Sequence, residues 1–383
     1  MEKFRKVLED PQKYAEAWQK KTGGKVMGYT CPYLPEELPY AAGILPVRML
    51  AQYAPDDSSE RYLPTGACPP SRNIMLHLMK GHYDYLAGMG CGEGCQWLRH
   101  TYSSWEAHGN TPYMHHVYVP IYPQGHGASD LLRGEMEVFK KSLEKWTGKT
   151  ITNKALDEAI EVYNINRRLL RQLYELRRAD NPAVLGSEAM DIVLASQVMD
   201  KAEHNLLLEK FLAKLPAWGA APSNGSSKVR IMLIGSETYD TRLEKLIESL
   251  GGNVVVDELC NGSSYFWNEV VPQKDRLMAI TLRYLDKYHC AIKDNRYRRR
   301  TARIQYLAED YNVHGAIVEM QRYCVPNGFD NPFVTDALKE RQVPFHFIEL
   351  QDTTFPSADL EMRLEAFIDM IRPSVATLAA AKV

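Results

Sequence analysis

The sequence predicts an α/β protein built from two doubly wound, Rossmann-like parallel-sheet lobes that are joined by a helical segment. Three observations predict it. Short apolar runs alternate with helical patterns in both halves, residues 131–214 are almost wholly helical by pattern, and 383 residues exceed the size at which one hydrophobic core keeps growing. We expect an N-terminal α/β lobe at 1–130, a helical segment with a linker at 131–227, and a C-terminal α/β lobe at 228–383.

The N-terminal lobe is expected to begin with an amphipathic helix over residues 1–22. A short apolar strand follows, then a loop that carries Cys31, a helix that starts near Pro35, and a second strand, PVRML. Glu36 and Glu37 stand in the first turn of that helix, where carboxylates suit the positive end of the helix dipole. HYDYLAGMG and HHVYVPIYP are two further expected strands.

The C-terminal lobe is expected to repeat this pattern after a linker. The stretch LPAWGAAPSNGSSK concentrates proline, glycine and serine, as linkers do. After it, VRIMLIGS predicts a buried strand, TRLEKLIESLGG a helix that ends in glycine, and NVVVDELC a second strand. HGAIVEMQRYC and VPFHFIEL are further strand-then-loop units. Strands that alternate with helices favour a parallel sheet.

The composition is that of a globular protein, with 45% hydrophobic and 25% charged residues. The net charge is −2 and both signs are mixed along the chain, which gives no electrostatic case for a nucleic-acid or membrane-surface partner. The first residues are charged and lack the apolar region of a secretory signal. No apolar run approaches the roughly 20 residues that span a bilayer. We therefore expect a cytoplasmic protein.

The seven cysteines indicate a site rather than a disulfide framework, because their number is odd and the expected compartment is reducing. Cys31, Cys95, Cys260 and Cys324 each follow an apolar run, and the loops after strands form the binding crevice of an open α/β sheet. Cys68, in ACPPSRN, is followed by two prolines that fix the backbone beside the thiol. Cysteines from both lobes could therefore converge on one cleft.

Three chemistries compete for such a cleft. A structural zinc is typical of paired cysteine knuckles, and only CGEGC, with Cys91 and Cys95, has that form. A nucleophilic cysteine needs a partner histidine, and the eleven histidines form no recognisable signature. An iron–sulfur site accepts dispersed thiolates from several directions. The residues alone leave these alternatives open.

Two short motifs bear on nucleotide binding. TGKT at 147–150 ends like a phosphate-binding P-loop, but Leu143 stands in place of the first glycine and no strand precedes it. GSETYD lacks the glycines of a dinucleotide fingerprint. We expect this chain to bind no nucleotide, so that any ATP involved would be bound by another polypeptide.

Four blocks, TCPYLPEELPYAAGILPVRM, ACPPSRN, CQWLRHTY and MQRYCVPNGFDNPF, resemble those of the 2-hydroxyacyl-CoA dehydratase and benzoyl-CoA reductase family. The resemblance covers nearly the whole chain. It implies a [4Fe-4S] cluster held by Cys68, Cys95 and Cys324. It also implies a paralogous cluster-bearing subunit, ATP-hydrolysing subunits that drive electrons into the pair, and ferredoxin as the electron donor.

A fifth block, ELCNGSSYFWNEVVPQKDRLMAITLRYLDKYHCAIKDNRYRRR, is most similar to the smaller cluster-bearing subunit of ATP-dependent (class I) benzoyl-CoA reductases. It contains Cys260 and Cys290. These two, with Cys31, fall where the double-cubane branch of the family has its extra cysteines, which implies a second cubane and a sulfide-bridged [8Fe-9S] cluster. Cys91 matches neither set.

The activity that the resemblance implies is the oxygen-sensitive reduction of benzoyl-CoA to cyclohexa-1,5-diene-1-carboxyl-CoA, an oxidoreductase step of anaerobic aromatic degradation. One alternative is a subunit of a radical (R)-2-hydroxyacyl-CoA dehydratase, which is a lyase. Another is an electron-transfer or scaffold subunit, or a double-cubane cluster reductase.

Further site candidates lie beside the cysteine loops or in a basic run. The proton-donor candidates are Glu36, His100 and Tyr102. The candidates for the surroundings of the cluster or of CoA are Arg72 and Arg99. The basic run Arg298, Arg299 and Arg300 could meet the CoA phosphates or an acidic partner, or could form a solvated helix face.

Overall fold

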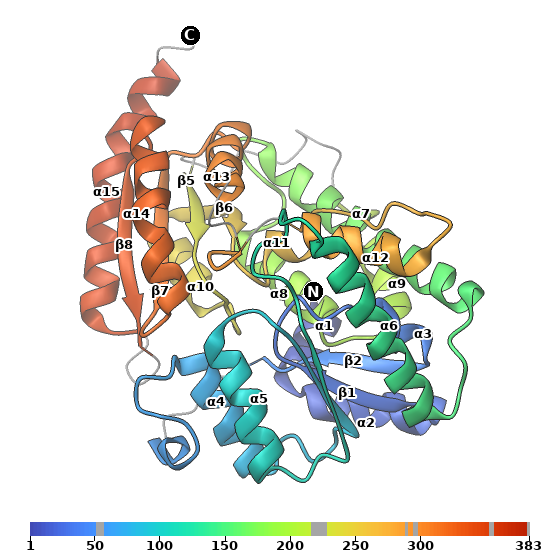
Figure 1. Ribbon diagram of the computed structural model, residues 1–383. Coiled ribbons are helices and arrows are strands. Elements are labelled where there is room, and N and C mark those ends of the chain that lie inside the picture. The colour runs from blue at the N-terminus through green and yellow to red at the C-terminus, as the bar shows by residue number, and fades with distance from the viewer. Residues whose placement is uncertain (51–56, 216–227, 288–289, 294–297, 352–355, 381–383) are drawn as a thin grey trace.

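The chain folds into two α/β lobes, and helices of the intervening segment contact both (Figure 1). The computed structural model describes residues 1–50, 57–215, 228–287, 290–293, 298–351 and 356–380. In Figure 1 the N-terminal lobe, blue to teal, lies below the C-terminal lobe, yellow to red. The predicted fold class, an α/β fold with two parallel-sheet lobes, is confirmed.

The first sheet is four-stranded and parallel, with the strand order β2-β1-β3-β4. Its strands are β1 (Lys25–Tyr29), β2 (Ile44–Arg48), β3 (Gly88–Gly92) and β4 (Tyr113–Val117). The accompanying helices are α1 (Glu2–Glu9), α2 (Pro11–Thr22), α3 (Glu37–Ala41), η1 (Asp57–Arg61), α4 (Pro69–Met79) and α5 (Gln96–His108). The strands β1, β2 and β3 lie almost wholly out of solvent, which explains their apolar and glycine-rich sequences.

The second sheet repeats this topology, with the parallel strand order β6-β5-β7-β8. Its strands are β5 (Val229–Ile234), β6 (Gly252–Glu258), β7 (Gly315–Gln321) and β8 (Phe345–Leu350). The helices are α10 (Arg242–Ser249), α11 (Ser263–Phe266), α12 (Arg276–Asp286), α13 (Arg299–Asp310), α14 (Val325–Glu340) and α15 (Ala358–Ala380).

The middle segment ties the two lobes together through helix packing. It comprises α6 (Ala128–Thr147), α7 (Asn153–Glu175), η2 (Leu176–Arg178), α8 (Gly186–Ser196) and α9 (Lys201–Leu212). Helix α7 packs against α3 of the first lobe and α12 of the second, while α8 packs against both α1 and β6. The linker predicted after α9 falls mostly on residues 216–227, outside the described residues.

Of the two helices predicted at the start of the first lobe, one is corrected and one is confirmed. The single helix expected over residues 1–22 is two helices, because Asp10 caps α2 by accepting the Lys13 N–H and Pro11 then starts the new helix. The helix expected near Pro35 is present as the five-residue α3, with Glu36 as its N-cap residue and Glu37 in its first turn.

Two strand predictions in the same lobe are also corrected. The strand expected over HYDYLAGMG starts only at Gly88 and continues to Gly92, so that Cys91 lies inside β3 and not in the loop after it. The strand expected over HHVYVPIYP ends at Val117, before Pro120, whose missing N–H cannot join a ladder.

Each sheet has one topological switch point, where the chain passes to opposite sides of the first strand. In the first sheet it lies between β1 and β3, and in the second between β5 and β7. Loops that leave two neighbouring strands in opposite directions open a crevice beyond the carboxyl ends of those strands. The site described below is lined by loops from both switch points.

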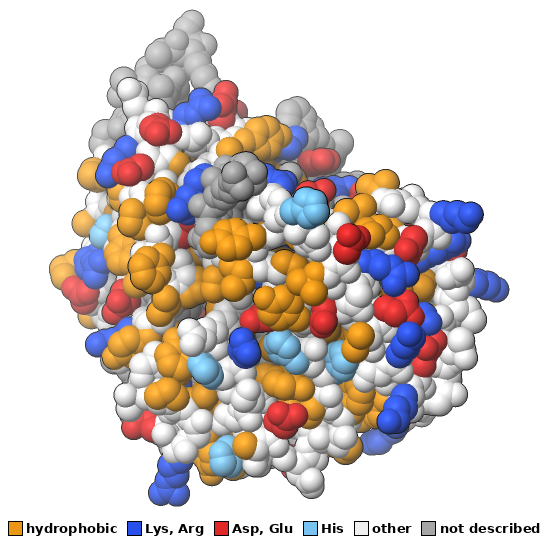
Figure 2. All heavy atoms as spheres, viewed as in Figure 1, with side chains coloured by type: hydrophobic (Ala, Val, Ile, Leu, Met, Phe, Trp, Pro, Cys, Tyr) orange, Lys and Arg blue, Asp and Glu red, His pale blue; other side chains and the backbone are white. Residues whose placement is uncertain are grey.

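The surface in the view of Figure 2 carries basic and acidic side chains close together, with hydrophobic side chains gathered around its middle. This mixture is consistent with the small net charge of the chain. Among the described helices, none combines the length and apolar character that crossing a membrane would require.

Candidate functional site

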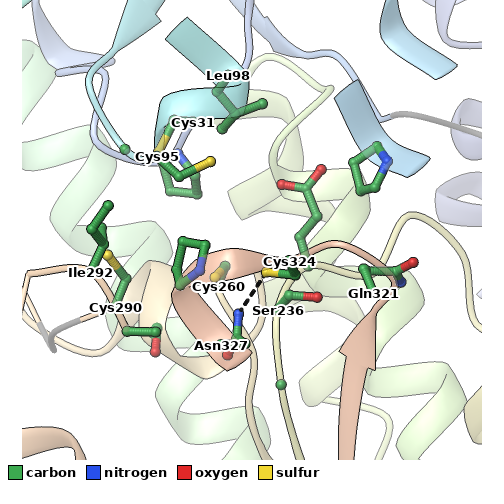
Figure 3. Close-up of a pocket in the computed structure, with 18 of the residues that line it drawn as sticks. Cys31, Cys95, Leu98, Ser236, Cys260, Cys290, Ile292, Gln321, Cys324 and Asn327 are labelled. Atoms are coloured by element: carbon green, nitrogen blue, oxygen red, sulfur yellow. Dashed lines mark hydrogen bonds between the residues drawn. The ribbon is translucent and has the colours of Figure 1, made fainter. Parts of the chain in front are cut away.

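Six of the seven cysteines line one cavity of about 100 Å³ between the lobes. Figure 3 labels all of them except Cys68. These six are Cys31, Cys68, Cys95, Cys260, Cys290 and Cys324. They include every cysteine that the sequence indicated as a ligand, and the loops that carry them extend along the chain from Cys31 to Cys324. Cysteines of both lobes therefore do meet at one cleft, which the sequence alone indicated only as possible.

Cys68, Cys95 and Cys324 share one local structure: each is the N-cap residue of a helix. They precede α4, α5 and α14 respectively. Proline stands in the first turn of both α4 and α14, where its missing N–H costs no hydrogen bond. The helix dipole at such positions favours a thiolate, but burial is the stronger effect here and raises the pKa of all three thiols.

Cys31, Cys260 and Cys290 lie in loops that also line the cavity. Cys31 follows β1 and its carbonyl accepts the Leu34 N–H at 2.9 Å. Cys260 follows β6, and its N–H donates to the Ser236 carbonyl at 2.6 Å. Cys290 follows α12.

Burial raises the pKa of thiols in both of these groups. Burial is the main cause at Cys95, and the charges of Cys68 and Cys324 raise its pKa further. Burial also raises the pKa of Cys260, where Cys290 is the neighbouring charge with the largest effect. Cys31 also raises the pKa of Cys95, and Cys324 that of Cys260, so the six thiols act on one another across both sets of three.

Cys91, the cysteine that matched neither set, lies in β3 and is completely buried. Its sulfur accepts a hydrogen bond from the Thr30 hydroxyl at 3.4 Å, and burial raises its pKa to about 12. It is not among the residues that line the cavity. Cys91 and Cys95 thus face different surroundings, Cys91 inside the first sheet and Cys95 in the cavity wall.

Two lysines and a tyrosine lie beside the second set of cysteines. Lys287 lines the cavity, is almost wholly buried and donates to the Pro32 carbonyl at 3.2 Å. Burial lowers its pKa to about 7, while nearby Cys31 acts in the opposite direction. The ammonium groups of Lys287 and Lys293 lie 4.7 and 5.1 Å from the centroid of the Tyr33 ring, and the Tyr33 hydroxyl is buried without a hydrogen-bond partner in the described residues.

Two further buried arginines hold carboxylates at the cavity. Arg300 lines the cavity, pairs with Asp330 of α14 and donates to the Gly235 carbonyl at 3.2 Å. Arg48, at the end of β2, pairs across the lobes with Glu237, which follows β5 and also lines the cavity. Cationic side chains are thus placed near the thiols from both lobes.

Polar side chains contact two of the thiol sulfurs directly. The Asn327 side-chain amide donates to the Cys324 sulfur at 3.3 Å, one turn along α14 (Figure 3). The Ser71 hydroxyl lies 3.4 Å from the Cys68 sulfur. Hydrogen bonds to a ligating sulfur are one means by which a protein tunes a metal centre.

The candidate proton donors are not in the cavity wall. Glu36 is buried and accepts hydrogen bonds from the hydroxyls of Tyr29 and Tyr265 at 3.0 and 3.1 Å. His100 is exposed on α5, and Tyr102 is buried on the same helix. None of the three candidates lines the cavity.

The structure places the candidate arginines in different surroundings. Arg72 and Arg99 lie on α4 and α5 outside the cavity lining, and Arg99 is largely exposed beside Glu93 at 3.5 Å. The basic run is not one solvated face, because Arg300 is buried at the cavity whereas Arg299 is exposed and pairs with Asp286. Arg298 shares Asp330 with Arg300.

The TGKT motif is a helix end. Gly148 has a φ of +70° and caps α6 by donating its N–H to the Glu144 carbonyl. Glycine is favoured at such left-handed positions. The glycine of this motif therefore ends a helix, whereas the glycines of a phosphate-binding loop precede one.

Several cavity residues were not singled out from the sequence: Tyr33, Lys287, Glu237, Ser236 and Gln321. A signal existed for some of them. Ser236 and Glu237 belong to GSETYD, which directly follows a predicted strand and so had the position of a site loop. Nothing in the sequence indicated that Lys287 lines a site, because a lysine at the end of an amphipathic helix usually lies in solvent.

No three His, Cys, Asp or Glu side chains in the described ranges converge as they would around a single metal ion. The six thiols instead surround a volume. Dispersed thiolates around a volume are suited to a polynuclear centre, whose metal atoms each face a different ligand.

Gly94 sets the position of Cys31 in this cavity. A β-carbon at Gly94 would lie 2.5 Å from the Cys31 sulfur. We expect Gly94→Ala to displace that thiol and to lower the free energy of unfolding by about 1–3 kcal/mol through overpacking. Urea unfolding and the rate of thiol labelling at Cys31 measure the two effects.

Gly134→Ala in α6 is the matched control, because nothing lies within 4 Å of its added β-carbon. It should leave both measurements unchanged or slightly raise stability, since alanine favours a helix. Equal behaviour of the two variants would contradict the close approach at Gly94.

Comparison with known proteins assigns these features to a family. A family model described as 2-hydroxyglutaryl-CoA dehydratase, D-component, matches residues 31–371. The chain is 25% identical to the beta subunit of lactoyl-CoA dehydratase from Anaerotignum propionicum over 377 residues, which cover 97% of this chain and 98% of that protein. It is 25% identical to one of the benzoyl-CoA reductase subunits of Thauera aromatica over 360 residues, 91% of each chain. A third relative is the beta subunit of (R)-2-hydroxyglutaryl-CoA dehydratase from Acidaminococcus fermentans, 24% identical over 97% of this chain and 98% of that protein.

Proposed function

Because the chain belongs to the 2-hydroxyacyl-CoA dehydratase and benzoyl-CoA reductase family, we propose that it is an iron–sulfur subunit that supplies low-potential electrons for a reaction of an acyl-CoA thioester. The observation that carries the proposal is the single cavity lined by six cysteines of both lobes. Soft thiolate donors favour zinc, copper(I) and iron–sulfur clusters, and six of them around one volume exceed what one metal ion or one cubane needs.

The residues present fit such a group. Cys68, Cys95 and Cys324 would hold one cubane, and Cys31, Cys260 and Cys290 a second. The buried Tyr33 hydroxyl lacks a partner in the described residues, and a cluster sulfide would accept its proton in a hydrogen bond. When bound, an iron–sulfur group of this kind supplies one-electron transfer at potentials as low as about −700 mV.

This chain's own side chains would hold the charge of such a centre. Thiolates in a buried site need nearby positive charge, and Lys287 and Arg300 line the same cavity. The Asn327 amide stabilises the Cys324 thiolate by donating to its sulfur. Burial keeps water away, which a reactive low-potential centre requires.

The substrate that we propose is benzoyl-CoA, reduced to the cyclohexadiene thioester. This choice rests on the block around Cys260 and Cys290, which resembles the smaller benzoyl-CoA reductase subunit. The proposed partners are a paralogous cluster-bearing subunit and ATP-hydrolysing subunits that receive electrons from ferredoxin. Relatives that are themselves named as subunits of a dehydratase and of a reductase support a multi-subunit assembly.

A second candidate function is the dehydration of (R)-2-hydroxyacyl-CoA. It is favoured by the names of several relatives, among them the beta subunits of the lactoyl-CoA and phenyllactyl-CoA dehydratases. In this reaction one electron is recycled, so that water is lost without net reduction.

An anaerobic assay of the reconstituted complex separates the two functions. We expect benzoyl-CoA to be consumed with two electrons from the reductant per diene formed, and with ATP hydrolysis. Turnover of a hydroxyacyl-CoA to the unsaturated thioester without net electron consumption would instead establish the dehydratase. Electron uptake by the chain with neither substrate turned over would leave it as an electron-transfer or scaffold subunit.

A further inference from the structure

A second, smaller cavity of about 40 Å³ lies next to the cysteine cavity at the carboxyl edge of the second sheet. Glu237 and Gln321 line both cavities, so that these two side chains form the wall between them. Glu319, on β7, lines the small cavity only. The volume is sufficient for at least one water molecule.

Glu319 is held in an unusual state for a carboxylate. The residue is 2% exposed, and one carboxylate oxygen, Oε1, accepts hydrogen bonds from the Ser236 N–H at 2.8 Å and the Ser236 hydroxyl at 3.3 Å. The other oxygen, Oε2, is buried without a hydrogen-bond partner in the described residues, as is Oε1 of Gln321. Two acceptors that lack donors in one buried region indicate that a proton or a water is needed there.

Ser236, which donates both of these hydrogen bonds to Glu319, also lines the cysteine cavity and so links this carboxyl to it. The Glu319 charge is among those that raise the pKa of the Cys324 thiol, after burial as the main cause. By reciprocity, negative charge added beside Cys324 must favour the protonated form of Glu319.

We propose that Glu319 and the small cavity form a buried proton site coupled to the cysteine cavity: Glu319 binds a proton when an electron enters that cavity and releases it when the electron leaves. This rests on the proposed function, which makes the cysteine cavity an electron carrier. The step is balanced, because one electron from the low-potential donor and one proton from solvent enter, and the carboxylate becomes a carboxylic acid. An acyl-CoA that is reduced needs both an electron and a proton, and Glu237 and Gln321 lie on the route between the two cavities.

The charges around Glu319 permit this exchange near neutral pH. Burial raises the pKa of Glu319 to about 7, Glu237 raises it further, and the Ser236 hydrogen bonds and the Arg300 charge lower it. Asp240 and Arg242 face the same small cavity from the loop after β5 and from α10. With a pKa in this range, a change of one nearby charge shifts the fraction of Glu319 that is protonated at neutral pH.

The test is the pH dependence of the midpoint potential of the purified, iron-loaded chain, measured by a redox titration monitored by electron paramagnetic resonance. In the wild type we expect the potential to fall as the pH rises through about 7, because reduction is then linked to proton uptake. Glu319→Gln, which keeps the shape and cannot titrate, should make the potential independent of pH in this range. An unchanged slope in Glu319→Gln, or a flat wild-type curve, would overturn the proposal.

Two further variants test whether the pH dependence of the potential is specific to Glu319. Ser236→Ala removes a hydrogen bond that lowers the pKa of Glu319, so the break in the curve should move to higher pH. Glu244→Gln is the matched control, because Glu244 is as deeply buried, has a pKa raised mainly by burial and lines neither cavity. It should leave the wild-type slope intact. The same slope change in Glu244→Gln as in Glu319→Gln would count against a specific site.

A measurement on the iron-free chain distinguishes failure of this inference from failure of the proposed function. Infrared spectroscopy should show a carboxylic-acid band that titrates near neutral pH and is absent in Glu319→Gln. If the band is present but the chain binds no iron, the proton site stands and the electron-carrier function fails. If iron is bound and the potential ignores Glu319, the function stands and the coupling fails.

Discussion

Cys68→Ala is expected to lower the iron content of the anaerobically purified chain by about four atoms, one cubane, with a parallel loss of acid-labile sulfide. Cys68 lines the cavity as the N-cap residue of α4, and burial raises its thiol pKa to about 12. A buried thiol of this kind stays protonated unless a cation such as iron stabilises the thiolate. A cubane held by only three cysteines has no spare protein ligand, so the loss of one of them is expected to release the whole cluster.

Two further variants, Cys31→Ala and Cys91→Ala, test the second cubane and the specificity of the iron loss. We expect Cys31→Ala to lose the second cubane and to keep the first, because the resemblance puts Cys31 in one set with Cys260 and Cys290, and the charge of Cys290 acts on Cys31. Cys91→Ala should keep all the iron, since Cys91 is buried in β3 and does not line the cavity. Unchanged iron in Cys68→Ala would refute the ligand assignment, whereas unchanged iron in Cys31→Ala would remove only the second cubane. Circular dichroism of each variant checks that the fold is retained.

The sheets and the cysteine loops could be predicted because both are local in sequence. Strand-forming runs are short and apolar, and in a parallel sheet each of them delivers the next loop to the same edge. Cys95 and Cys324 stand directly after such runs, and Cys68 stands before two prolines. Their positions at helix N-termini therefore follow from local rules alone.

The rest of the site could not be predicted, because it arises where segments distant in sequence meet. Lys287 is an ordinary helix-end lysine until it lies against the Pro32 carbonyl, 255 residues away. Arg48 is an ordinary strand-end arginine until Glu237 of the other lobe pairs with it. Glu36, in contrast, had a local explanation as a first-turn carboxylate, and the structure places it in a buried network with tyrosines of both lobes.

The neighbouring Glu37 shows how strongly this interlobe network is held. It pairs with Arg167 of α7 and accepts a hydrogen bond from the Tyr284 hydroxyl of α12 at 3.0 Å. Glu37 and Arg167 have side-chain exposures of 0% and 4%, so water cannot replace either partner. One carboxylate thus joins the first lobe, the middle segment and the second lobe.

Glu37→Ala is therefore expected to lower the free energy of unfolding by about 3–5 kcal/mol, because it leaves the Arg167 charge buried without its partner. Urea unfolding measures the change. Glu158→Ala is the control, since the Glu158–Lys154 pair is exposed at 66% and 86% and should contribute under about 1 kcal/mol. The double variant Glu37→Leu/Arg167→Met should lose less than the sum of the single changes, because no unpaired charge remains.

The pH dependence of stability gives an independent test of the same pair. Burial alone would raise the pKa of Glu37, but the Arg167 and Arg283 charges outweigh it and hold that pKa below the ordinary value of 4.5. A carboxyl whose pKa is lower in the folded state stabilises the protein fully above pH 4.5 and loses this contribution as the pH falls through the folded value. We therefore expect the wild type to lose stability in acid over a range in which Glu37→Gln, already destabilised, changes less. If both proteins lost stability in parallel as the pH fell, the Glu37–Arg167 pair would not be the source of this pH dependence.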